Sequence, residues 1–378
     1  MNPIFIQMKP LSEVRFGFIG AGAIAHHAAD AVLSHPHAKL VAIQDLNVDR
    51  LKTLQKKHSL EYAYETVEEL VANKSVDAVY IAVPNKFHIP LTIQALEAGK
   101  HVILEKPFAM NAAEAEKAIA MAKKSGRVLF VGMNQRFTAD SQKIKSLVEQ
   151  GILGDIYHAK AYWMRRTGIP KLGTWFGNKE LAGGGSLYDI GVHMLDLCLY
   201  TINNFEPVSV VGATYTKFGN RGLGEGGWGL SDRSEAPFDV DDFASAFIRF
   251  ANGATVALDT SWACHQAEGN KDNVEIFGTE AGATLRPARL FRADPRPPAS
   301  YEVLNDLKVP LKMPHQERFH NFINHLRGEE ELCVSTHQAL VVQKILDGIA
   351  ESNRTGKEVR LAQASPKKIT HQQKRKSS

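Results

Sequence analysis

Residues 183–197 read GGGSLYDIGVHMLDL and place ionisable residues at helical spacing after three glycines. Asp189, His193 and Asp196 recur three and four positions apart, which puts their side chains on one face of a helix. An imidazole and a carboxylate on one face can transfer protons and bind hydroxyl groups. The glycines leave room for a ligand close to the backbone. This segment is therefore a candidate site for proton transfer.

The same residues have a structural explanation. Ser186 and Asp189 show the S-x-x-D spacing of a capping box, and a single histidine on a helix is more often a core residue than a catalyst. The glycines favour chemistry, because a helix that needs only a cap does not require three of them. For the helix alone both interpretations stay open.

Lys106 is a second candidate, because it follows a short apolar run. It lies in LEKPF (104–108), and the segments VPNKFH (83–88) and MNQRF (133–137) follow two similar runs. In open parallel sheets, ligands bind outside the carboxyl ends of the strands. Lys106 is therefore expected at a crevice with polar neighbours, although lysines at strand ends are more often solvated charges.

An alternation of apolar runs and amphipathic segments surrounds these residues. Continuous apolar runs are typical of strands buried on both faces of a parallel sheet. The expected strands are 15–20, 39–44, 77–83, 101–104 and 127–132, and the helices between them are 23–34, 48–58, 89–99 and 112–126. The pattern predicts a doubly wound, parallel α/β domain of the Rossmann type over residues 1–135.

The pattern changes after residue 135, where strands of alternating polarity dominate. Helices are expected at 141–151, 315–328 and 336–353, and strands at 156–166, 208–218, 243–250, 254–262 and 273–278. This predicts an α+β domain with a mostly antiparallel sheet over residues 136–363. The glycine-rich segment 219–230 is interpreted as a surface loop in preference to a substrate lid.

Gly20, Gly22 and Ala25 form G-x-G-x-x-A between the first expected strand and helix, the pattern that cradles a dinucleotide pyrophosphate. Asp45 follows at the end of the second strand, where an acidic residue binds the adenosine ribose hydroxyls. A carboxylate there repels the 2′-phosphate of NADP, so NAD is expected and NADP is less favoured. Arg50 is the cation that counters this argument, and a helix cap is the structural alternative for Asp45.

Composition and charge narrow the possible partners, metal sites and cellular location of the protein. The formal charge of the 378 residues is +4, but five cations fall in the last twelve residues, so the body is nearly neutral and no nucleic-acid partner is expected. Residues 364–378 are expected to be a basic, disordered tail. The three cysteines lie far apart, which argues against a metal site. Without a long apolar run or an export signal, a cytoplasmic protein with no membrane partner is expected.

Four segments in order, GFIGAGAIA, AVPNKFH, ALEAGKHVILEKPFA and GGGSLYDIGVHMLDL, give the chain a resemblance to the Gfo/Idh/MocA family over roughly residues 14–362. The family is named for glucose–fructose oxidoreductase and inositol dehydrogenase. The resemblance implies a Rossmann domain, a second α/β domain with an open mixed sheet, and hydride transfer between a nicotinamide and a secondary alcohol. It also implies that the second domain, residues 136–363, binds the substrate and forms a homodimer or homotetramer through its sheet. No metal is implied.

The resemblance implies roles for three residues. Lys106 corresponds to the lysine of the family's EKP motif, and Asp189 and His193 to its D-x-G-x-H segment. His193 would take the hydroxyl proton, Lys106 would hydrogen-bond the same oxygen, and Asp189 would bind a second hydroxyl.

Two wider sets of contacts are expected. The expected substrate is a sugar, a sugar derivative or a cyclitol, which calls for several polar groups and an aromatic face. The cofactor set is Gly20, Gly22, Ala23, Ile24, Asp45, Pro84, Asn85, His88, Glu105, Lys106 and Asn134. The substrate set is Lys106, Arg165, Arg166, Trp175, Asp189, His193 and His265.

Two other functions remain open. One is an NAD-dependent glycoside hydrolase, in which the cofactor is reduced and restored within each turnover. The other is a catalytically silent dinucleotide-binding regulator, and the presence of both Lys106 and His193 counts against it.

Overall fold

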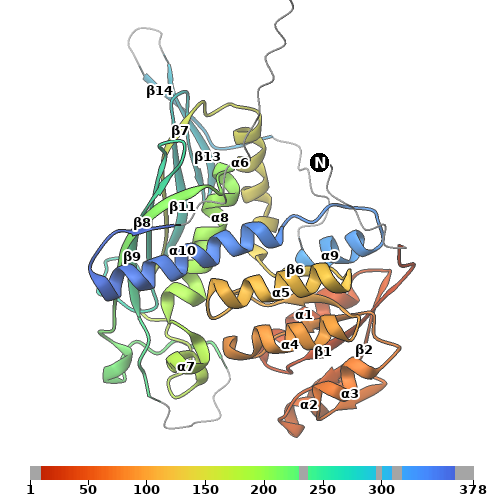
Figure 1. Cartoon of the computed structure of the whole chain (residues 1–378). Coiled ribbons are helices and arrows are strands. Elements are labelled where there is room, and N and C mark those ends of the chain that lie inside the picture. Colours follow the sequence, from red (N-terminus) through yellow and green to blue (C-terminus); the bar gives the residue numbers. More distant parts are fainter. Residues whose placement is uncertain (1–9, 230–236, 295–299, 309–316, 362–378) are drawn as a thin grey trace, which may run out of the picture.

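The computed structural model describes residues 10–229, 237–294, 300–308 and 317–361, which form two sheets flanked by helices (Figure 1). The first sheet is entirely parallel, in the order β3-β2-β1-β4-β5-β6. Its strands are β1 (Val14–Ile19), β2 (Ala38–Gln44), β3 (Tyr62–Tyr64), β4 (Ala78–Ile81), β5 (His101–Leu104) and β6 (Leu129–Val131). Its helices are α1 (Ala23–Leu33), α2 (Val48–His58), α3 (Val67–Ala72), α4 (His88–Glu97) and α5 (Ala112–Ser125). The predicted Rossmann architecture is confirmed.

Burial explains which elements the sequence pattern predicts. Every residue of β4 and β5 is buried, so these strands are continuous apolar runs. The pattern misses β3 and α3. The three residues of β3 are all only half-buried at the edge of the sheet, and α3 has only six residues.

The second sheet has the order β14-β13-β12-β11-β7-β10-β9-β8-β15. Its strands are β7 (Ile156–Arg165), β8 (Pro207–Tyr215), β9 (Phe243–Phe250), β10 (Thr255–Ser261), β11 (Asn270–Gly278), β12 (Gly282–Leu285), β13 (Ala288–Asp294), β14 (Ser300–Leu304) and β15 (Val359–Arg360). All neighbouring pairs are antiparallel except β7 with β10, so the prediction of a mostly antiparallel sheet is confirmed. The basic tail predicted at 364–378 lies outside the described residues.

Four helices join the two sheets. Helices α6 (Ala139–Glu149) and α8 (Val192–Ile202) pack on the second sheet, and α10 (Thr336–Thr355) crosses the junction to contact both β8 and α5 (Figure 1). Helix α9 (Arg318–Leu326) returns to the first sheet, where Phe319 and Phe322 pack against Phe16 at ring distances of 6.4 and 6.1 Å. In the described part of the chain, no helix is long and apolar enough to cross a membrane.

A buried ion pair holds α8 in place. Arg136 follows β6, and its guanidinium donates to both carboxylate oxygens of Asp196 in α8, at 2.8 and 2.5 Å. It also donates to the Cys333 carbonyl and the Gln338 side chain near the start of α10. Asp196 is therefore a structural residue, although its spacing from His193 suggested membership of the chemical face.

Replacing Asp196 by Leu should destabilise the protein by roughly 3–5 kcal/mol, because the buried Arg136 loses its counter-charge. Urea unfolding followed by circular dichroism measures this loss. The double variant Arg136→Met/Asp196→Leu should recover much of it, since two apolar residues leave no uncompensated charge. Glu351→Ala breaks the exposed pair with Arg354 and is the control, with an expected change below about 0.5 kcal/mol. A Leu variant as stable as wild type would contradict the structural role.

Candidate active site

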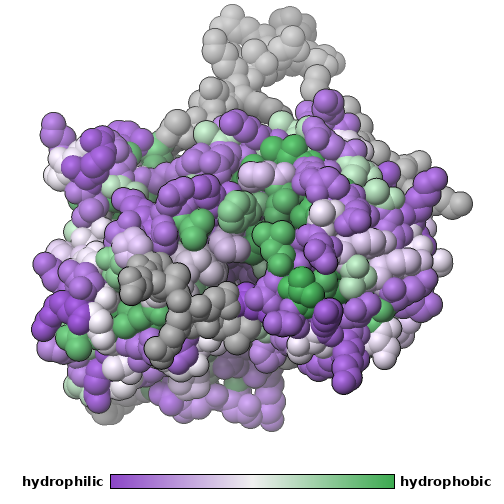
Figure 2. Space-filling model, turned by 90° about the horizontal axis from the view of Figure 1, so that it is seen from below, coloured by the Kyte–Doolittle hydropathy of each residue, from purple (hydrophilic) through white to green (hydrophobic). Residues whose placement is uncertain are grey.

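A cavity of about 1140 Å³ lies at the carboxyl ends of the first sheet and extends under the second domain. Seen from below, this face of the molecule is hollowed near its centre, with apolar side chains beside the hollow (Figure 2). Such a volume accommodates a ligand of cofactor size.

The glycine-rich turn after β1 forms one end of the cavity. Gly20 has φ +101° and a side chain there would lie 2.3 Å from the Ala82 carbonyl, so only glycine fits. A side chain at Gly22 would meet no described atom within 4 Å, so this face is open to a ligand. Gly22 precedes α1, whose first amides favour an anion. Ala25 is fully buried, and its small side chain allows close helix–sheet packing.

Asp45 lies beside this turn and lines the cavity. One carboxylate oxygen accepts the Ala21 amide at 2.6 Å, and the other accepts the Asn47 amide at 2.7 Å. Asn47, and not Asp45, caps α2, because its side chain accepts the Arg50 amide. The helix-cap alternative for Asp45 is therefore wrong, and its carboxylate joins the second strand to the glycine turn.

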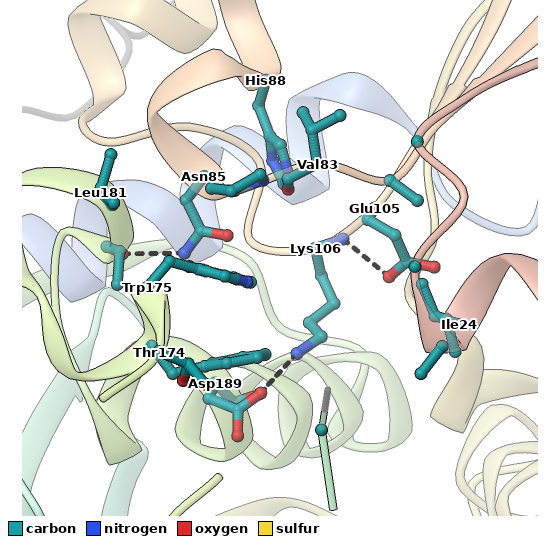
Figure 3. A pocket seen from close by; sticks show the side chains of 18 of the residues that line it. Ile24, Val83, Asn85, His88, Glu105, Lys106, Thr174, Trp175, Leu181 and Asp189 are labelled. Atoms are coloured by element: carbon teal, nitrogen blue, oxygen red, sulfur yellow. Dashed lines mark hydrogen bonds and ion pairs between the residues drawn. The ribbon is translucent and has the colours of Figure 1, made fainter. Parts of the chain in front are cut away.

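Lys106 and Asp189 meet in the middle of the cavity. Lys106 follows β5 and extends across the cavity to Asp189, with Thr174 and Trp175 on that side and Ile24 on the other (Figure 3). Its ammonium lies 2.8 Å from Asp189 Oδ1 and 3.1 Å from the Asp189 carbonyl. Burial raises the pKa of Asp189, but the charge and hydrogen bond of Lys106 outweigh burial and lower it.

His193 lines the same cavity from the first turn of α8. Burial and the positive charge of Lys106 lower its pKa to about 3, so the imidazole is neutral at physiological pH. Its Nδ1 atom is buried and has no hydrogen-bond partner among the described residues. The Trp163 ring lies 6.3 Å away, centroid to centroid. The two candidates from separate parts of the sequence therefore do converge on one space.

A π-helical turn, η4 (Leu187–Gly191), carries Asp189. Such turns are rare in proteins, and those that occur often lie at functional sites. Trp262, which is fully buried, donates its indole N–H to Asp189 Oδ2 at 2.9 Å. Because one carboxylate oxygen faces Lys106 and the other faces Trp262, the orientation of Asp189 is fixed.

Asp241 shapes the three-glycine turn. The sequence did not predict this role of Asp241. Its carboxylate accepts the Gly185 amide at 2.7 Å, the Leu187 amide at 2.9 Å and the Ser186 hydroxyl at 2.7 Å. A side chain at Gly185 would lie 1.8 Å from the Asp241 carbonyl. This glycine is therefore required by the protein's own backbone, and the capping-box interpretation of Ser186 is wrong.

Glu105 and Arg318 form a buried ion pair behind Lys106. Glu105 also accepts the Tyr80 hydroxyl at 2.6 Å, and Arg318, from α9, donates to the Gly132 carbonyl at 2.8 Å. Burial raises the pKa of Glu105, but Arg318 outweighs burial and lowers it to about 2. The Lys106 amide donates to Glu105 at 3.2 Å, so the pair supports the backbone of Lys106.

Two polar residues after β4 tie this strand end to its surroundings. Asn85 donates to the Ala182 carbonyl at 2.8 Å, a bond that reaches α7 (Lys179–Ala182) below the second sheet. The two ring nitrogens of His88 lie 2.8 Å from the Pro107 carbonyl and 3.0 Å from the Val83 carbonyl. Both residues line the cavity, and their polar groups already hold its walls together.

Comparison with known proteins supports these observations. Residues 14–133 match the model of an oxidoreductase family with an NAD-binding Rossmann fold, and residues 141–284 match the GFO/IDH/MocA C-terminal domain. This chain belongs to the Gfo/Idh/MocA family. It is an oxidoreductase, and its first domain is an NAD-binding Rossmann domain.

Relatives of known name cover most of the chain. D-glucoside 3-dehydrogenase of Escherichia coli (strain K12) is 33% identical over 353 residues, which span 93% of this chain and 98% of the relative. Myo-inositol 2-dehydrogenase of Thermotoga maritima is 31% identical over 267 residues, 71% and 73% of the two chains. A structure of levoglucosan dehydrogenase with NADH and levoglucosan shares the fold, with a TM-score of 0.78 at 24% identity over 93% of this chain and 100% of that one.

Most residues expected at the site of this family member do line the cavity. Those from the cofactor set are Gly20, Gly22, Ala23, Ile24, Asp45, Pro84, Asn85, His88, Glu105, Lys106 and Asn134. Those from the substrate set are Lys106, Arg165, Trp175, Asp189 and His193. Their contacts with cofactor and substrate stay predictions.

Two residues of the substrate set do not line the cavity. Arg166 donates to the carbonyls of Gln266 and Ala267, and the His265 ring packs on Phe218 at 5.0 Å. Neither is part of the site that we describe. The glycine-rich segment was expected to be a surface loop away from the site. Its residues Gly226–Gly229 instead line the cavity.

His193 should stay neutral between about pH 5 and 8, because burial and Lys106 hold its pKa near 3. Replacing Lys106 by Met removes the nearby positive charge and leaves Asp189, so the pKa of His193 should rise. An NMR titration of the histidine ring protons measures both values, with His193→Asn as the assignment variant. Lys86→Met, which removes a cation paired with Glu180, is the matched control. A wild-type imidazole that titrates near pH 6.5 would contradict the argument that burial and Lys106 lower the pKa of His193.

Proposed function

We propose that this enzyme is an NAD-dependent dehydrogenase that oxidises a secondary hydroxyl of a sugar, sugar derivative or cyclitol, or reduces the matching ketone. The observation that carries the proposal is the convergence of Lys106, Asp189 and His193 in a cavity that begins at the dinucleotide turn. The names of the relatives, which are dehydrogenases of a glucoside and of myo-inositol, support the substrate class.

The residues present fit a dinucleotide. The open face of Gly22 and the first amides of α1 would hold the pyrophosphate, and Asp45 would hold the adenosine ribose. Bound NAD supplies the hydride acceptor for oxidation of the alcohol. Ile24, Pro84 and Lys106 line the same cavity.

His193 would act as the general base. Because its imidazole is neutral, one ring nitrogen has a lone pair that accepts the hydroxyl proton while the carbon–hydrogen bond breaks. Release of that proton is what makes the alcohol a good reductant. In the reverse direction the same nitrogen returns the proton to the oxygen.

Lys106 would bind the same oxygen. An ammonium group has three hydrogens, and two of them are directed at Asp189 Oδ1 and the Asp189 carbonyl. The third is left for the substrate, where it stabilises negative charge that develops on oxygen. Asp189 retains lone pairs that can accept a second hydroxyl, so one residue orients both the lysine and the sugar.

Arg165 would contribute a further substrate contact. Its guanidinium lies over the Trp163 ring at 4.5 Å and reaches the Gly168 carbonyl at 3.5 Å. Burial lowers its pKa, and the charge of Asp189 opposes this. A planar donor fork beside the reacting centre suits two neighbouring hydroxyls of a sugar ring.

Mixing the pure enzyme with NAD and a panel of sugars, glucosides and inositols should produce net NADH, followed by absorbance at about 340 nm. Lys106→Ala and His193→Ala should each lower turnover by about 100-fold or more, since each removes a proton-transfer or oxyanion group. NAD binding, measured by calorimetry, should be largely retained in both variants.

Lys86→Ala is the control, because this lysine is exposed and does not line the cavity. Cleaved glycoside without net NADH would replace the proposal by a redox-assisted hydrolase. Cofactor binding with no turnover across the panel would replace it by a regulator.

Replacing Asp45 by Asn should reduce the preference for NAD over NADP by about tenfold, because the negative charge that repels the 2′-phosphate is removed. The ratio of kcat/KM values for the two cofactors measures the preference. Asp49→Asn changes the same charge at an exposed position of α2 and should leave the ratio unchanged. A wild-type enzyme that prefers NADP would contradict the assignment.

A further inference from the structure

Three aromatic side chains, Trp175, Phe176 and Trp228, line the second-domain side of the cavity. The rings of Trp175 and Phe176 stack with centroids 3.9 Å apart, and Trp228 meets Phe176 edge-on at 5.2 Å. Trp228 is 50% exposed. A large aromatic surface left open inside a cavity is typical of a ligand contact.

The backbone of the loop that carries Trp228 is held in a defined place. The Gly168 and Ile169 amides donate to the Gly224 carbonyl at 3.0 and 2.9 Å, and the Gly226 amide donates to the Ile169 carbonyl at 2.8 Å. The Lys171 amide donates to the Trp228 carbonyl at 3.2 Å. Segments 168–171 and 224–228 thus form a small ribbon, and Trp228 is presented from it.

The start of this loop is anchored as well. The carboxylate of Asp242 is fully buried and accepts the amides of Lys217 at 2.8 Å, Phe218 at 2.6 Å and Gly219 at 3.1 Å. The neighbouring Asp241 holds the three-glycine turn that precedes Asp189. One dipeptide therefore positions both the reacting segment and the base of the Trp228 loop.

In its described residues, the wall around Trp228 is open and uncharged. A side chain at Gly227 would meet no described atom within 4 Å, so space lies in front of this residue. In the described part of the wall, residues 173–176 and 226–229, no side chain is ionised. Lys171 and Glu225 flank the wall and neutralise each other at 3.6 Å. This described part of the surface suits a neutral ring and presents no unpaired cation to a phosphate or carboxylate.

We propose that Trp228 and its aromatic neighbours form a subsite for the second ring of a glycoside. The inference rests on the proposed function, because the first ring must present its hydroxyl to Lys106 and His193 in the same cavity. The second ring, a sugar or an aryl group on the glycosidic oxygen, would stack on the Trp228 face. The physiological substrate is then a glycoside with a neutral ring aglycone, in preference to a free monosaccharide.

The test compares methyl glucosides, phenyl glucosides and a glucose disaccharide, each in both anomeric forms, with wild type and Trp228→Ala. Wild type should show a higher kcat/KM for the two-ring substrates than for the methyl glucosides. Trp228→Ala should lower this ratio by about threefold to tenfold, the effect of one ring contact, and leave kcat/KM for the methyl glucosides nearly unchanged. The phenyl and disaccharide arms show which kind of ring the subsite prefers.

Trp228→Phe retains a ring and should keep much of the ratio. Tyr301→Ala removes a 77% exposed aromatic of β14 outside the cavity and is the matched control. Equal ratios in wild type and Trp228→Ala would overturn the subsite while the dehydrogenase proposal stands. If no glucoside is oxidised, calorimetry with NADH decides: tighter binding of phenyl than of methyl glucoside, lost in Trp228→Ala, supports the subsite, and no difference overturns it.

Discussion

The contact between Lys106 and Asp189 is the constraint on which the rest of the site depends. It joins the end of β5 in the first sheet to the π-helical turn under the second, and only 16% and 14% of the two side chains are exposed. Two charges in such a place are costly unless their geometry is good. The two domains must therefore keep a fixed position relative to each other. Helices α9 and α10 and the hydrogen bond from Asn85 to the Ala182 carbonyl maintain this position.

The fold could be predicted wherever local pattern and burial agree. The buried strands of the first sheet are continuous apolar runs, and Asn252–Gly253, a typical hairpin turn sequence, lies between the paired strands β9 and β10. Strands β12, β13, β14 and β15 were missed, because β12 and β15 are short, β13 buries only Ala288 and Leu290, and β14 buries no residue. The return of α9 to the first sheet was missed because an amphipathic helix does not specify which surface its apolar face meets.

The site was predictable where a motif contains its own chemistry, as for Lys106 and for the segment of Asp189 and His193. Its supports come from far along the chain: Trp262 fixes Asp189 and Asp241 fixes the glycine turn, and neither lies in a pattern that names its partner. Arg165, the last residue of β7, lines the cavity, whereas the side chain of Arg166 donates to the Gln266 and Ala267 carbonyls. The sequence alone does not distinguish these two adjacent arginines.

Charge balance explains how four ionised side chains lie close together in one cavity. Lys106 neutralises Asp189, and Arg318 neutralises Glu105 directly behind it. The four charged side chains together are therefore close to neutral. A neutral ligand that enters the cavity therefore leaves none of these four charges uncompensated. The same ion pair acts on His193, because burial and the charge of Lys106 lower the pKa of its imidazole while the charge of Asp189 opposes this. In the proposed mechanism, the general base and the oxyanion donor therefore both depend on the ion pair of Lys106 and Asp189.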